Sequence, residues 1–173
     1  MTLLTTRTTD LLQRGDTLDA SLWHPFCRQL FDYWRSLPPA DPALSSLPGR
    51  DKFDPIAVRG LLPYITMLDV QAEPLRFRLR LVGTMMTTWL RQDPTGRWLD
   101  ELSGDITNMH ERLAWVVQHG QPSWRHGSKR IGPGRDYGSS ETLALPLAGN
   151  GAAVDRLLCI GMVYNPDGQP VLR

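Results

Sequence analysis

This sequence has little cysteine, little net charge and no long apolar run. Its two cysteines, Cys27 and Cys159, are too few for a disulfide framework or a cysteine metal cluster. The formal net charge of the 173 residues is only +1, whereas proteins that bind nucleic acid need a basic surface. No apolar stretch approaches the roughly 20 residues that span a bilayer, and residues 1–16 do not have the pattern of a secretory signal. We therefore expect a cytoplasmic protein with no nucleic-acid partner, no membrane partner and no bound metal.

Catalytic motifs are also missing. The chain contains no G-x-S-x-G, no H-E-x-x-H and no C-x-x-C, and the pair Ser139-Ser140 has no base beside it in sequence. We therefore predict that the chain is not an enzyme. The one cluster of basic residues in the sequence fits either an anion site or an exposed strand and loop. Its members are Arg125, Lys129, Arg130 and Arg135.

The most informative feature that is present is the run Phe77–Thr84. Apolar and polar residues alternate through Leu81, which is typical of a strand with one buried face. Gly83 then stops the strand, and Thr84 is a candidate cap for a following helix rich in methionine and tryptophan. A half-buried strand that leads into such a helix predicts one wall of a small apolar cavity.

A second informative segment begins at Pro25, which suits the first turn of a helix. The predicted helix runs to Leu37 and has an apolar arc wider than one domain face usually needs. We expect part of this arc to form a homodimer interface, although the helix covering its own sheet is the alternative. The interface residues would be Phe26, Leu30, Phe31 and Trp34.

The remaining pattern predicts strands at 64–70, 76–82, 123–130, 141–147 and 156–164, the third of them an edge or twisted strand. A long helix capped by Asp105 runs to His119 between the second and third strands, and Gly149-Asn150-Gly151 forms the turn between the last two. Antiparallel strands interrupted by a helical block indicate an α+β domain with one sheet that is covered on one face. We divide the chain into a flexible leader, an N-terminal helix with a proline-rich linker, a core and a tail. Their ranges are 1–22, 23–50, 51–166 and 167–173.

Several short motifs follow one another in an order that resembles the PAS domain, in particular a bacterial subfamily of short single-domain PAS proteins. The pieces are Leu47-Pro48-Gly49-Arg50, Asp54-Pro55, Leu61-Leu62-Pro63, the run 77–84, Asp93-Pro94-Thr95-Gly96-Arg97, Glu101-Leu102, Pro146-Leu147 and Asp155-Arg156. The resemblance implies a PAS-like five-stranded antiparallel sheet covered by helices, with an extra N-terminal helix here. It also implies a pocket, sensing, signal relay and dimerisation, but no particular ligand.

The candidate ligand-binding residues are apolar positions of the predicted sheet and helices, and the alternative is that they only fill the core. They are Phe77, Leu79, Leu81, Met85, Trp89, Met109, Leu113, Leu145 and Ile160. In some PAS domains a helix histidine binds haem, and His110 is the candidate here, although a lone histidine is weak support. The Asn-Cys-Arg context of flavin-binding PAS photosensors is absent.

The leading hypothesis is therefore a non-catalytic sensory module. It would bind a small apolar or amphipathic ligand and signal through subunit contacts to a separate signalling protein. The alternatives are a ligand-free protein-interaction adaptor and, less favoured, a haem-binding sensor.

Overall fold

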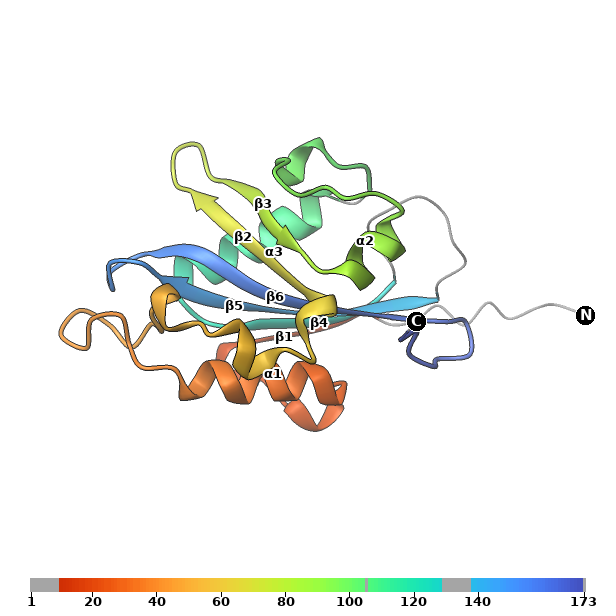
Figure 1. The fold of residues 1–173 in the computed structure, drawn as a ribbon, viewed down its shortest axis with the longest axis horizontal. Coiled ribbons are helices and arrows are strands. Elements are labelled where there is room, and N and C mark those ends of the chain that lie inside the picture. The colour runs from red at the N-terminus through yellow and green to blue at the C-terminus, as the bar shows by residue number, and fades with distance from the viewer. Residues whose placement is uncertain (1–9, 105, 129–137, 173) are drawn as a thin grey trace, which may run out of the picture.

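The computed structural model describes residues 10–104, 106–128 and 138–172, and these form one antiparallel sheet with helices on both of its faces (Figure 1). The strands stand in the order β1-β4-β5-β6-β2-β3. Their bounds are β1 Leu11–Arg14, β2 Ile65–Gln71, β3 Arg76–Val82, β4 Ser123–Gly127, β5 Ser139–Ala148 and β6 Val154–Tyr164. The predicted α+β class and antiparallel sheet are confirmed, with one strand more than expected.

The two longest strands, β5 and β6, form the middle of the sheet. They are joined as a hairpin at the predicted glycine turn, where Gly151 has a φ of 82°. Alternate residues of β5 face opposite layers. Leu143, Leu145 and Leu147 pack with one core cluster, and Ala144 packs with the other. The central strand β5 is therefore buried on both faces.

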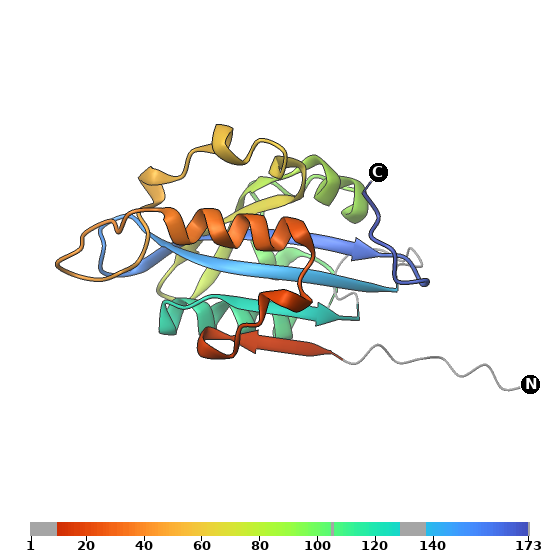
Figure 2. The same ribbon diagram turned by 90° about the horizontal axis from the view of Figure 1, so that it is seen from below.

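Helix α1, Pro25–Ser36, covers one face and α3, Ile106–His119, covers the other (Figure 2). The short helix α2, Thr84–Leu90, lies on the α3 side, and its Trp89 also joins the core cluster that packs under α1. The sequence predicted these helices, but it assigned a cover to only one face. Pro25 occupies the first turn of α1, and His24 Nδ1 accepts a hydrogen bond from Phe26 N at 3.1 Å. The expected cap Thr84 does not act as one, because Gly83 takes the capping position of α2 without a side-chain bond. Asp105, the expected cap of α3, lies outside the described residues.

The additional strand, β1, lies within the predicted flexible leader. It pairs with β4 from Leu11↔His126 to Arg14↔Ser123, so β4 is an inner strand and not the expected edge. Gln13 Oε1 fixes the segment by accepting hydrogen bonds from Trp23 Nε1 and Asp19 N, both at 2.9 Å. A four-residue strand without a long alternation gives almost no sequence signal, which is why residues 11–14 were assigned to a leader.

A bulge interrupts the pairing of β2 and β3. Leu68 faces Leu79 and Met67 faces Leu81, so Arg80 has no partner in the register. An extra residue reverses the facing of every later side chain in the bulged strand. Leu79 is therefore 4% exposed, whereas Leu81 is 43% exposed, and Val82 points to the side that the simple alternation would have given Leu81. The prediction of Leu81 as a buried residue is wrong for this reason.

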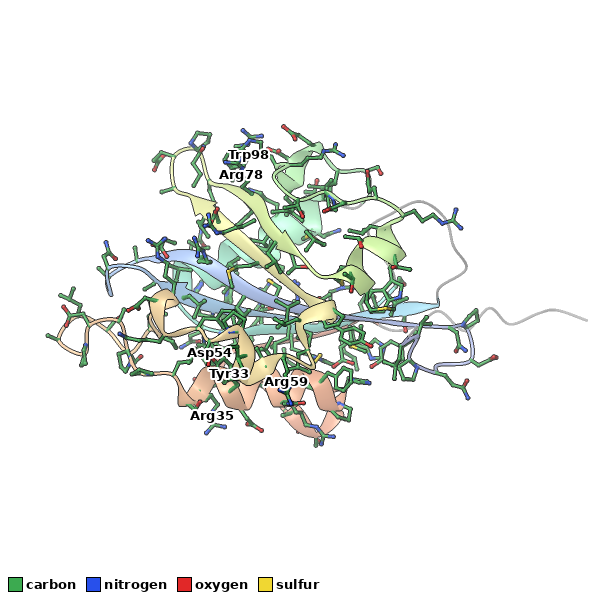
Figure 3. All side chains as sticks on the ribbon, viewed as in Figure 1. Tyr33, Arg35, Asp54, Arg59, Arg78 and Trp98 are labelled. Carbon is green, nitrogen blue, oxygen red and sulfur yellow. The ribbon has the colours of Figure 1, made fainter. Side chains whose placement is uncertain are left out.

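The outer edge of β3 is covered by the loop that follows α2 (Figure 3). Arg78 forms a bridge pair with Trp98, and Leu79 N donates to Arg97 O at 2.9 Å. The Arg76 guanidinium lies over the Trp98 ring at 4.2 Å. These contacts hold the loop against the strand and leave β3 less open to pairing with another chain.

The bulge makes a simple prediction about stability. Leu79→Ala should lower the free energy of unfolding by about 2–5 kcal/mol, because it creates a cavity in the core, whereas Leu81→Ala should change it by less than about 0.5 kcal/mol. Urea unfolding followed by tryptophan fluorescence measures both values. Equal losses in the two variants would contradict the register described here.

Candidate binding cavity

A cavity of about 380 Å³ lies between the sheet and the layer formed by α2 and α3. Two cross-strand rows supply much of its floor. The first row runs Arg14, Ser123, Ala144, Cys159, Thr66 and Val82, and the second runs Leu12, Arg125, Thr142 and Gly161. Every residue of these two rows lines the cavity, except Ser123 and Ala144. The floor therefore draws on strands from both ends of the sheet.

The opposite wall comes from helices. Met86, Trp89 and Leu90 of α2 line it, together with Met109 and Leu113 of α3. A Cβ on Gly161 would lie 3.1 Å from Met86 Sδ, so the absence of a side chain at Gly161 lets α2 approach the sheet. Met side chains adapt readily to irregular space, and the volume is within the lower range of ligand pockets.

The structure brings together most of the residues predicted from the sequence to bind a ligand. The five that line the cavity are Leu79, Trp89, Met109, Leu113 and Ile160. Phe77 and Leu145 are buried in the two core clusters, and Met85 packs against the cluster on the α1 side. Leu81 is exposed because of the bulge. Leu145 points toward α1 and away from the cavity, because the side chains of β5 alternate between the two faces of the sheet and helices cover both faces.

Apart from Arg125, which belongs to the candidate anion site, sequence reasoning missed the polar part of the lining. Its residues are Asp10, Arg14, Thr66, Asn108, Glu111, Arg112, Arg125, Ser140 and Thr142. Arg112 is 8% exposed and donates from Nη1 to Thr142 O at 3.1 Å. The sequence did contain a signal for Arg112, because it lies three residues after Met109 and side chains at this spacing share one face of a helix. Of the cluster of basic residues noted in the sequence, Arg125 lines the cavity, while Lys129, Arg130 and Arg135 lie outside the described residues.

Cys159 places a thiol in the floor of this cavity. It lies in β6 in the first cross-strand row, and its surface is partly accessible although it is enclosed by protein. Burial raises the pKa of the Cys159 thiol to about 12, an effect that the nearby Arg112 charge partly offsets. The thiol is therefore neutral at physiological pH and poorly nucleophilic.

A second polar feature lies on the opposite face, where Glu141 is 1% exposed beneath the start of α1. Its Oε1 accepts from His24 N at 2.8 Å and from Trp124 Nε1 at 2.7 Å, and its Oε2 accepts from Tyr164 OH at 2.5 Å. Burial, followed by this carboxylate, raises the pKa of the Cys27 thiol. Burial and the same carboxylate also raise the pKa of Tyr164. Glu141 therefore joins α1 to three strands, a role that no pattern in the sequence indicated.

The predicted homodimer residues lie on α1. Leu30 is fully buried against the chain's own sheet, which leaves it no surface for another subunit. Phe26, Phe31 and Trp34 are half-buried and pack against the core, and Trp34 Nε1 donates to Pro146 O at 2.9 Å. The wide apolar arc of the helix is thus used largely inside the chain, because α1 packs against β5.

The haem candidate His110 lies apart from the cavity. Its Nε2 is 2.9 Å from Leu75 O, and its ring packs edge-on against Phe77. It does not line the cavity, so the geometric basis for haem ligation is removed. Within the described ranges, no three histidine, cysteine or acidic side chains gather as metal ligands do. None of the helices in those ranges has the length and apolar run needed to cross a bilayer.

Comparison with known proteins now identifies the family. Residues 22–162 match the sequence profile of the PAS domain, and the chain belongs to that family. PAS domains are sensory and signalling modules and are generally non-catalytic. The comparison with curated proteins gives no match.

The fold is also similar to that in the solved structure of an RNA-binding light-oxygen-voltage receptor. The TM-score is 0.51 and the sequence identity is 13%, and the similarity covers 90% of this chain and 39% of that chain. This chain therefore spans well under half of the receptor's length, and the likeness concerns the fold alone.

The state of Cys159 predicts the pH dependence of its alkylation. With a thiol pKa of about 12, the rate of reaction with iodoacetamide should rise about tenfold per pH unit from pH 7 to pH 10, because only the thiolate reacts. An exposed thiol instead reaches a plateau above about pH 8.5–9. Mass spectrometry measures the rate, and Cys159→Ser removes the signal of this residue. A plateau near pH 9 would contradict the enclosed position.

The Glu141 cluster makes a prediction about stability. Tyr164→Phe should lower the free energy of unfolding by about 1.5–3 kcal/mol, because it removes a hydrogen bond to a buried carboxylate. Tyr33→Phe is the matched control, because its exposed hydroxyl bonds to the Asp54 backbone (Figure 3) and its loss should cost less than about 1 kcal/mol. Both values come from urea unfolding. A loss for Tyr164→Phe no larger than that of the control would show that the cluster does not hold α1.

Proposed function

We propose that this chain is a non-catalytic sensory module that binds a small apolar or amphipathic molecule in the cavity between the sheet and α2/α3. The observation that carries the proposal is the cavity of about 380 Å³ with a largely apolar lining. The interiors of small domains are normally close-packed, so a space of this size at the centre of the fold is typical of a binding site.

The two faces of the sheet offer a route for the signal. Strands β5 and β6 carry cavity residues on one face and contact α1 on the other. A ligand that presses on the floor at Cys159 and Gly161 acts on the same strands that hold Glu141 and Tyr164. Occupancy would then shift the balance between two arrangements of α1, provided that the ligand prefers one of them.

The recipient of the signal, in this proposal, is a second copy of the chain or a separate signalling protein that contacts α1. The half-buried aromatic residues Phe26, Phe31 and Trp34 supply apolar contact area there. Ile56, in the 3₁₀ turn Pro55–Val58, is 76% exposed. Tyr33 OH lies 2.7 Å from Asp54 N and so fixes this turn against α1 (Figure 3). The exposed Ile56 side chain also supports the second candidate function, a ligand-free interaction adaptor.

A cavity-filling variant tests the proposal. Cys159→Phe adds a ring to the cavity floor, and Leu81→Phe adds the same ring on the exposed surface of β3. Native mass spectrometry of protein purified from cells should show a reproducible added mass for the wild type and for Leu81→Phe. The added mass should be lost in Cys159→Phe, because the ring occupies the space of the ligand.

Circular dichroism controls for folding in both variants. A wild-type chain that carries no added mass, and whose melting temperature does not change across a panel of metabolites, would favour the adaptor over the sensor.

A further inference from the structure

The cavity has two chemically different ends. One end lies under α2 and the 3₁₀ turn Leu99–Glu101, where its lining is apolar; it includes Leu68, Leu79, Val82, Leu90 and Leu99. The other end lies between the first half of α3 and the strands β1, β4 and β5. There the lining contains almost all of the charged and hydroxyl-bearing side chains. An occupant that matches both ends has an apolar body and one polar end.

Guanidinium groups dominate the polar end. Arg14, Arg112 and Arg125 come from β1, α3 and β4, and two of them are nearly buried, with Arg112 8% exposed and Arg125 9% exposed. The acidic residues of the lining are Asp10 and Glu111. Among the lining residues that the structure describes, three arginines stand against two carboxylates.

The contacts of these arginines hold them in place around the space. Arg125 Nη2 donates to Asp10 Oδ2 at 3.0 Å and to Ser128 O at 2.8 Å. Arg112 Nη1 donates to Thr142 O at 3.1 Å, and the Arg14 guanidinium lies 5.1 Å from the Trp115 ring centre. Each guanidinium has five N–H donors in a fork that fits a carboxylate.

We propose that the ligand of this cavity is an amphipathic organic acid, with its carboxylate beside Arg112 and Arg125 and its apolar body under α2. The inference rests on the proposed function, which requires only that the cavity is occupied. The volume sets the size. At about 30 Å³ for each water molecule, 380 Å³ holds about a dozen waters, and decanoate has a similar number of heavy atoms.

Three probes of equal chain length separate the contribution of the head group from that of the chain. Isothermal titration with decanoate, 1-decanol and decylammonium should give affinities in that order. Decanoate should bind at least about tenfold more tightly than decanol, because its carboxylate gains charge-assisted hydrogen bonds. Arg112→Gln should weaken decanoate binding about tenfold and decanol binding less than about twofold. The exposed Arg59→Gln is the control and should change neither affinity.

The outcomes distinguish the two proposals. Equal affinities for decanoate and decanol, or tighter binding of decylammonium, would overturn the organic-acid assignment and leave a binding cavity in place. Failure of all three probes to bind would also overturn the assignment, while the mass spectrometry described above decides separately whether the cavity is occupied. The comparison of probes uses the wild-type chain, so it is decisive even if Arg112→Gln does not fold.

Discussion

The interaction on which the arrangement most depends is the burial of the Glu141 carboxylate beneath α1. A carboxylate that is 1% exposed is unfavourable unless donors surround it, and here His24 N, Trp124 Nε1 and Tyr164 OH all donate to it. Two of these donors come from strands and one from the entry to α1. These hydrogen bonds hold the start of the helix in place against the sheet.

This constraint has a consequence on the opposite face. Because α1 occupies one side of β5 and β6, the other side is left to the short helix α2 and the single longer helix α3. These two helices do not fill the space above Cys159 and Thr142, and the cavity results. The strand β1 closes one side of it, so a segment that appears peripheral in the sequence supplies Arg14 to the site.

Much of the fold could be predicted from the sequence, because long periodic elements carry strong signals. The alternation of β3, the proline that starts α1 and the glycine turn between β5 and β6 all placed their elements correctly. The short strand β1 could not be predicted, since its pairing with β4 depends on contacts made by Asp10 and Gln13 that sequence spacing does not encode. The bulge at Arg80 was equally invisible, and it alone moved Leu81 out of the core.

The lining of the cavity was predictable in its apolar half and, among its polar residues, only at Arg125. Apolar residues on a known period indicate which side of an element is buried, so Leu79, Met109 and Leu113 were named, and the structure places them in the lining. Whether a buried residue fills the core or lines a space depends on packing between elements, which is why Phe77 and Leu145 were also named, although they lie in the two core clusters. Arg112 was missed because a charged residue in a helix is normally solvated, and its burial is a property of the assembled fold.

The central claim is that the space between the sheet and α2/α3 takes a ligand, and the methionines test it most directly. The sequence has six methionines; Met86 and Met109 line the cavity, whereas Met67 and Met85 do not, and Met162 lies opposite Glu141 on the α1 face of the sheet. With ¹³C-methyl-labelled methionine, titration with decanoate should shift the NMR signals of the Met86 and Met109 methyl groups and leave those of Met67 and Met85 in place. Uniform small shifts of all the methyl groups, or shifts confined to Met67 and Met85, would contradict the account.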